Sequence, residues 1–124
     1  EGDKKRGKLL ILMDKKNLTD SRYDYERLEQ VIGCKWSVSV LQAVRMGINR
    51  PGALEKNIEG ISAKVLAERL KRLTGYGLLE KQVFAEVPPR TEYSLTDSGE
   101  VLVGIIASIH QLDLRMKDDR DNLA

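Results

Sequence analysis

Apolar residues recur at three- and four-residue spacing in two stretches that follow a mixed N-terminal segment. The first apolar face consists of Tyr25, Leu28, Val31 and Ile32, and Gly33 follows it as a stop signal. The second face consists of Trp36, Val40, Leu41 and Val44, and Gly47 closes it. The spacing therefore predicts helices over about 24–33 and 36–46, with Trp36 as an aromatic anchor of the core.

The next two predicted helices are joined by a tight turn. Pro51 suits the first position of a helix, and a short apolar pattern from Leu54 to Ile58 ends at Gly60. Ser62 is an N-cap candidate for a following helix, which fades at Gly75 and Gly77. The apolar side of that helix consists of Val65, Leu66, Leu70 and Leu73. Two helices joined by a turn that contains glycine make a helix-turn-helix.

A β-hairpin is expected after these helices. The segment 78–86 is β-branched and aromatic at its centre, and 91–95 alternates apolar and polar residues. Between them, adjacent prolines remove two backbone donors, so 87–90 forms a loop with Arg90 held outward at a Pro-Pro-Arg tip. We also expect a short strand or turn at 48–50.

The last predicted helix begins at a cap formed by Thr96 or Asp97. Its apolar stripe consists of Val101, Leu102, Ile105, Ile106, Ile109 and Leu112. After Leu114 the chain is highly charged, and we expect it to fray there.

The order of these elements predicts a mainly α fold with a small β-hairpin, the arrangement of a winged helix-turn-helix. We expect one domain over 23–116, an N-terminal arm over 1–22 and a charged tail over 117–124. The arm is either a segment that packs on a partner subunit or sequence foreign to the natural protein. Its apolar run, Leu9–Met13, is far shorter than the roughly 20 residues that span a bilayer, so neither membrane insertion nor secretion is expected.

In such a fold the outer face of the Ser62 helix meets the major groove of double-stranded DNA. Opposite the buried leucines lie Ser62, Ala63, Lys64, Ala67, Glu68 and Lys71. The small residues allow close approach, the lysines suit phosphates or base acceptors, and the carboxylate suits a cytosine amino group. Arg50 and Arg90 are further phosphate candidates. The alternative interpretation of these residues is an ordinary solvated surface.

The amino-acid composition limits which kinds of site and activity the chain can have. With 21 Lys and Arg against 19 Asp and Glu, the net charge of +2 does not by itself indicate a nucleic-acid partner. One cysteine, Cys34, and one histidine, His110, exclude an intramolecular disulfide and a Cys/His metal cluster, and they suit a reducing cytoplasm. No phosphate loop or catalytic triad occurs, so we expect neither an enzyme nor a cofactor.

Several motifs resemble those of the HxlR-type winged-helix transcription regulators of bacteria and archaea, within the MarR-like superfamily. They are Ile32-Gly33-Cys34-Lys35-Trp36, Gly60-Ile61-Ser62-Ala63-Lys64-Val65-Leu66, Leu70 with Gly77-Leu78, and Glu86-Val87-Pro88-Pro89-Arg90-Thr91-Glu92-Tyr93-Ser94-Leu95-Thr96 with Gly99. The resemblance covers about 23–112. It implies a homodimer whose first and last helices form the interface, while the Ser62 helix and the hairpin contact DNA.

The long apolar stripe of the last helix favours the same dimer, because a three-helix core needs only part of it. The candidate interface residues are Leu28, Val101, Ile105, Ile109 and Leu112. The alternative is that this helix folds back on its own core.

Many members of this family sense oxidants or electrophiles through a cysteine at the position of Tyr23, which is absent here. Cys34 stands instead of the second glycine in the usual Gly-Gly-Lys-Trp, where a nearby helix N-terminus and lysine favour a thiolate. It is either a site for an oxidant or small-molecule effector or an inert packing residue. The function expected overall is a sequence-specific, dimeric transcription regulator. The alternatives are a protein-interaction module and a DNA-binding protein without operator specificity.

Overall fold

The computed structural model describes residues 25–123, so the expectations for the arm 1–22, for Tyr23 and for Ala124 lie outside the described residues. Along the chain it contains α3 (Glu26–Ile32), α4 (Lys35–Arg45), α5 (Pro51–Asn57), α6 (Ala63–Gly75), β1 (Leu79–Phe84), β2 (Arg90–Leu95) and α7 (Asp97–Leu123). These elements confirm the expected fold class, mainly helical with one antiparallel hairpin. Residues 48–50, expected as a short strand or turn, form an irregular connection.

The helix-turn-helix consists of α5 and α6. Pro51 is the first residue of α5, where its missing N–H costs nothing. Gly60, in the turn, has a positive φ of 85° that suits glycine. The Ser62 hydroxyl accepts a hydrogen bond from the backbone N–H of Val65 at 3.1 Å, which makes Ser62 the N-cap of α6 as expected. The turn and the cap together fix the direction in which α6 leaves α5.

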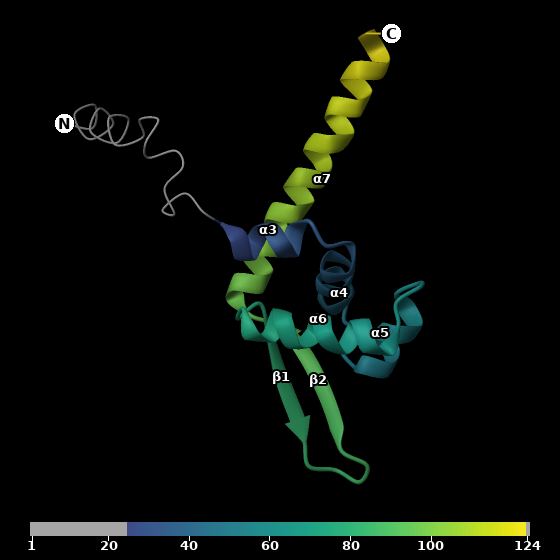
Figure 1. Cartoon of the computed structure of the whole chain (residues 1–124), viewed down its shortest axis with the longest axis vertical. Helices are drawn as coiled ribbons and strands as arrows, with labels where there is room; N and C mark the ends of the chain where they lie inside the picture. Colours follow the sequence, from purple (N-terminus) through teal and green to yellow (C-terminus); the bar gives the residue numbers. More distant parts are fainter. Residues whose placement is uncertain (1–24, 124) are drawn as a thin grey trace, which may run out of the picture.

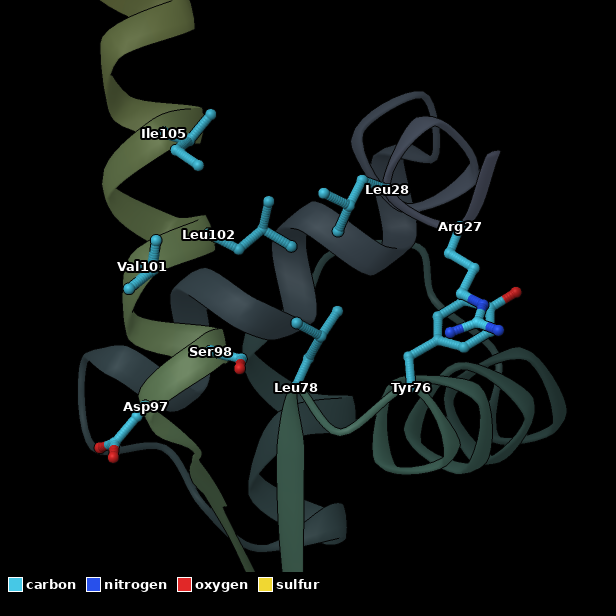
Figure 2. Close-up of a pocket in the computed structure, with 9 residues that line it drawn as sticks. All are labelled: Arg27, Leu28, Tyr76, Leu78, Asp97, Ser98, Val101, Leu102 and Ile105. Atoms are coloured by element: carbon cyan, nitrogen blue, oxygen red, sulfur yellow. The ribbon is translucent and has the colours of Figure 1, made fainter. Parts of the chain in front are cut away.

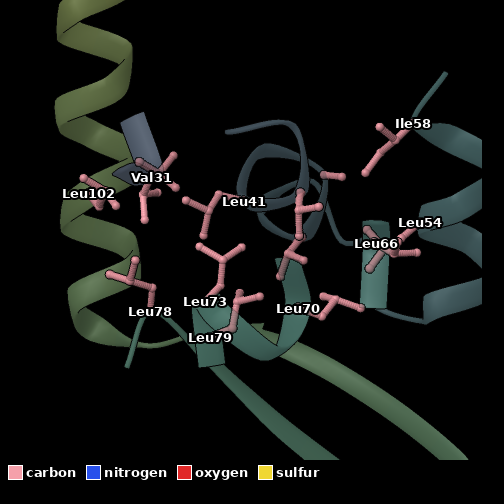
Figure 3. Packing of buried hydrophobic residues seen from close by; sticks show 14 of the residues in the cluster. Val31, Leu41, Leu54, Ile58, Leu66, Leu70, Leu73, Leu78, Leu79 and Leu102 are labelled. Atoms are coloured by element: carbon pink, nitrogen blue, oxygen red, sulfur yellow. The ribbon is translucent and has the colours of Figure 1, made fainter. Parts of the chain in front are cut away.

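The core lies where α4, α6, β1 and α7 converge, and Figure 3 shows its leucine-rich packing. Leu41 from α4, Leu73 from α6 and Leu79 from β1 are essentially inaccessible to solvent. Trp36 is half-buried and packs against this cluster, as the sequence predicted. Burial of these side chains holds α6 rigidly by one face and leaves the opposite face to solvent.

The hairpin, or wing, pairs β1 with β2 from Leu79 opposite Leu95 to Phe84 opposite Arg90. Outside the sheet, the backbone N–H of Tyr93 donates to the carbonyl of Asn49 at 2.8 Å. This bond ties the wing to the segment just before α5. The wing and the helix-turn-helix are thus joined by the backbone as well as by the core.

Thr96 precedes α7, and its hydroxyl accepts from the N–H of Gly99 at 3.0 Å and donates to the carbonyl of Gly77. The helix continues to Leu123, so the expectation that the chain frays after Leu114 was wrong. The physical reason is that no glycine or proline follows Gly104 to stop the helix. Figure 1 shows the second half of α7 extending away from the other elements, opposite to the wing.

Candidate nucleic-acid interface

The outward face of α6 is a strip of small and charged side chains. Leu66, Leu70 and Leu73 are buried on the inner side of the helix. The residues of α6 and its N-cap that were predicted to meet DNA are all exposed, namely Ser62, Ala63, Lys64, Ala67, Glu68 and Lys71. The structure therefore presents these residues to solvent together on the helix that a helix-turn-helix uses for base readout.

A cleft of about 560 Å³ runs beside this face and connects α6 to α5 and the wing. Ala63, Ala67 and Lys71 line it from α6, Gly52 from α5 and Lys81 from β1. Sequence reasoning missed Gly52 and Lys81. For Lys81 a signal existed, because the alternation of a hairpin strand places every second side chain on the same face.

At the wing, two predicted phosphate contacts form a cluster with carboxylates. Arg50 Nε lies 3.7 Å from Glu92 Oε1, and Arg90 Nε lies 3.6 Å from the same oxygen. Arg90 Nη2 is 3.4 Å from Glu86 Oε1, and its guanidinium stacks over the Phe84 ring at 4.1 Å. These four charged residues, Arg50, Glu86, Arg90 and Glu92, are called the wing cluster below.

The wing cluster corrects one expectation from the sequence. Arg90 was expected to stand outward at the tip of the hairpin, held there by the two prolines. It is instead the first residue of β2, paired with Phe84, and its side chain is only 30% exposed. The attraction of two carboxylates and an aromatic face for a guanidinium explains why it folds back.

Cys34 lies where α4 meets α6. It occupies the N-cap position of α4, and Arg69 Nε of α6 donates to its sulfur at 3.3 Å. Partial burial raises the pKa of the Cys34 thiol. The hydroxyl and N–H of Ser37, the Arg69 side chain and the N–H of Trp36 outweigh that effect and lower the pKa from 9.0 to about 7. At neutral pH the thiol is therefore about half ionised, and its sulfur contacts α6 through Arg69.

A second surface, formed by α3 and α7, is apolar. Val101, Ile105, Ile109 and Leu112 of α7 are exposed by 44–64%, and Leu28 of α3 by 38%. The apolar stripe that the sequence predicted on α7 therefore has two parts. Leu102 and Ile106 lie in the core, and the other four residues are exposed. Figure 2 shows a groove of about 520 Å³ between α3 and α7, lined by Leu28, Val101 and Ile105 among others. The predicted interface residues therefore share one exposed apolar surface.

Within residues 25–123 no cluster of His, Cys, Asp or Glu has the arrangement to hold a metal ion. None of the helices described there is both long and apolar enough to cross a membrane.

The α5–α6 pair, the wing behind it and the exposed outer face of α6 define a winged helix-turn-helix protein. Residues 31–120 match the HxlR-like helix-turn-helix family, and the chain belongs to it. This is a family of transcriptional regulators, so the expected class, a helix-turn-helix regulator rather than an enzyme, is confirmed.

Similar proteins agree with this assignment. An uncharacterised HTH-type transcriptional regulator of Synechocystis is 38% identical over 78 residues, which cover 63% of this chain and 58% of that protein. A solved structure assigned to a MarR-family transcriptional regulator of Enterococcus faecalis superimposes with a TM-score of 0.74 at 29% identity, covering 84% of this chain and 94% of the other. The redox regulator HypR in its oxidised form superimposes with a TM-score of 0.62 at 28% identity, covering 68% and 87% of the two chains.

Proposed function

We propose that this protein is a cytoplasmic, sequence-specific transcription regulator that binds a near-palindromic operator as a homodimer. The observation that carries the proposal is the exposed outer face of α6 beside the cleft that α5 and β1 complete. In this arrangement α6 enters the major groove and the wing follows the adjacent backbone. The two half-sites are separated by about ten base pairs or a multiple of that.

The residues on α6 have distinct roles in this complex. Ala63 and Ala67 are small enough to let the helix backbone approach the base edges. Lys64 and Lys71 bind phosphates or base acceptors, and Glu68 accepts from a cytosine amino group. Lys81, on the wing side of the cleft, adds a phosphate contact.

The second copy of the chain covers the apolar surface of α3 and α7. The exposed residues Ile105, Ile109, Leu112 and Met116 follow one another at spacings of four, three and four, the pattern of a helix that packs along another helix. Every residue from 107 to 123 is exposed in the single chain. A helix with no tertiary contacts is only marginally stable in water, so a partner along this length supplies the missing burial.

DNA from upstream of the gene for this protein, compared with an unrelated duplex across a range of salt, tests the proposal. A preference of about 10³ or more, with affinity falling steeply with salt, is the expected result. Equal and weak binding to both duplexes would instead favour a non-specific or protein-interaction role.

Lys64→Ala is expected to weaken operator binding about fivefold to tenfold, because one cationic contact in the major groove is lost. The matched control is Lys117→Ala, which removes the same charge from the distant half of α7 and is expected to leave binding within about twofold, as remote exposed charges are screened by salt. Fluorescence anisotropy with labelled operator DNA measures both variants. Equal affinities of the two variants would remove α6 from the interface.

We also propose that an oxidant acts on the regulator through Cys34, since the relative HypR is a redox regulator and Cys34 contacts α6 through Arg69. The thiolate attacks a hydroperoxide, forming an S–O bond and breaking the O–O bond. The products are a neutral sulfenic acid and an alkoxide. Loss of the negative charge weakens the attraction of the sulfur for Arg69 and so alters how α6 is held.

The rate of Cys34 alkylation by iodoacetamide is expected to rise with pH with a midpoint near 7, because only the thiolate reacts and the folded protein lowers the pKa of the thiol. Arg69→Met should move the midpoint toward 9, since the guanidinium no longer stabilises the thiolate. A midpoint near 9 in the unmodified protein would contradict the assigned environment. Mass spectrometry of the alkylated protein at a series of pH values gives the profile.

A further inference from the structure

The charges of the wing cluster are balanced before any DNA arrives. Glu92 Oε1 lies within 3.7 Å of Arg50 Nε and within 3.6 Å of Arg90 Nε. Glu86 adds a second carboxylate to Arg90 at 3.4 Å. Two cations and two anions therefore face one another, and the cations that the sequence assigns to phosphates already have anionic partners.

Glu92 is the central member of the wing cluster. Its side chain is 26% exposed and shared between both arginines, whereas Glu86 is 52% exposed and pairs with Arg90 alone. The hydrogen bond from the N–H of Tyr93 to Asn49 fixes the strand next to Glu92 against the segment that carries Arg50. The backbone thus brings the carboxylate and the two guanidinium groups together.

A cation that is paired with a carboxylate contributes less to DNA binding than a free one. Much of the affinity of a protein for DNA comes from counterions released when Lys and Arg neutralise phosphates. Where Glu92 already neutralises Arg50 and Arg90, a phosphate must either displace the carboxylate or lie near its negative charge. Both alternatives reduce the electrostatic gain from this part of the wing.

We infer that Glu92 competes with DNA phosphates for Arg50 and Arg90 and so holds down the affinity of the protein for duplex DNA of any sequence. This inference rests on the proposed DNA-binding function. Glu92 thus limits the affinity for DNA through the two arginines. A carboxylate at a DNA interface would otherwise be regarded only as an unfavourable contact.

The test compares Glu92→Gln with Glu80→Gln. Both changes remove one carboxylate from the same hairpin without changing the shape of the side chain. Among residues 25–123, Glu80 on β1 takes part in no ion pair, so its change reports the general effect of charge. The probe is a fluorescein-labelled 30-base-pair duplex of mixed sequence, titrated by anisotropy at several salt concentrations.

Glu92→Gln is expected to bind this duplex about fivefold to tenfold more tightly than the unmodified protein, with a steeper dependence on salt, since Arg50 loses its carboxylate partner and Arg90 keeps only the exposed Glu86. Glu80→Gln is expected to change affinity about twofold or less. In an Arg50→Gln background the gain from Glu92→Gln should shrink, because the arginine that pairs with Glu92 alone is absent. Equal affinities of Glu92→Gln and Glu80→Gln, or weaker binding by a folded Glu92→Gln, would overturn the role of Glu92.

Two further comparisons distinguish an effect on folding, failure of the proposed function and failure of the role of Glu92. If Glu92→Gln lowers the thermal unfolding midpoint, Glu92→Thr removes the same charge with a residue suited to a strand and must show the same gain. If the unmodified protein and Glu92→Gln both lack salt-dependent binding, the proposed function fails together with this inference. If the unmodified protein binds and Glu92→Gln and Glu80→Gln bind equally, only the role of Glu92 fails.

Discussion

Replacement of Gly99 by alanine is expected to destabilise the protein by about 3 kcal/mol and to lower its unfolding midpoint by about 10 °C or more. A Cβ atom at Gly99 would overlap the backbone carbonyl oxygen of Leu78, because the two atoms would be much closer than van der Waals contact allows. That oxygen also accepts a hydrogen bond from the N–H of Thr96 at 3.1 Å. No side-chain rotation relieves a clash with backbone, so the first turn of α7 must move away from β1.

The matched control is Gly104→Ala, five residues further along α7. A Cβ at Gly104 meets nothing within 4 Å, so this change is expected to be neutral or to stabilise by about 0.5–1 kcal/mol through helix propensity. Thermal and urea unfolding followed by circular dichroism, at one fixed protein concentration, compares the variants. If Gly99→Ala were as stable as Gly104→Ala, the close contact of α7 with the start of β1 would be wrong.

Ile109→Glu is expected to raise the dissociation constant of the homodimer about 100-fold or more. Two-fold symmetry places two such carboxylates at one apolar interface, and each loses hydration without gaining a partner. The fold of the single chain should survive, because Ile109 is 44% exposed and lies outside the core. Operator affinity should fall with dimerisation, since a monomer reaches only one half-site.

Gln111→Glu provides the control for Ile109→Glu, because it adds a carboxylate at an exposed position two residues away along α7. Adjacent positions on a helix face different directions, so this carboxylate avoids the apolar stripe. Sedimentation equilibrium gives the dissociation constants, and circular dichroism checks the helix content. A dimer that tolerates Ile109→Glu as well as Gln111→Glu would place the interface elsewhere on the chain.

The helices of the DNA-binding half were predictable because local signals and tertiary packing agree there. Pro51 and Ser62 mark the starts of α5 and α6 as predicted, while Gly60 lies in the turn between them, three residues beyond the end of α5 at Asn57. The exposed strip on α6 followed from the same periodicity, since the buried leucines determine which residues face outward. These features depend on neighbours along the chain, which a single sequence contains.

The features that were missed depend on contacts between distant segments. Glu92 approaches Arg50 only because the wing folds back beside the start of α5, and no local pattern reports that pairing. Arg90 was misplaced for the same reason, since the prolines beside it indicate a loop but not which carboxylates its side chain will reach. The length of α7 was underestimated because a charged surface helix and a frayed tail have similar compositions.

A single residue, Thr96, separates the last strand of the wing from the first turn of α7. The wing and α7 are therefore joined almost directly, so the position of the wing depends on the direction in which α7 leaves the core. The 27 residues of α7 form an arm of about 40 Å. A tilt of this arm by about 5° shifts its far end by about 3 Å relative to the wing, on the scale of one base-pair rise. In a dimer, the angle at which the two α7 helices cross would then determine which spacing between operator half-sites the protein accepts.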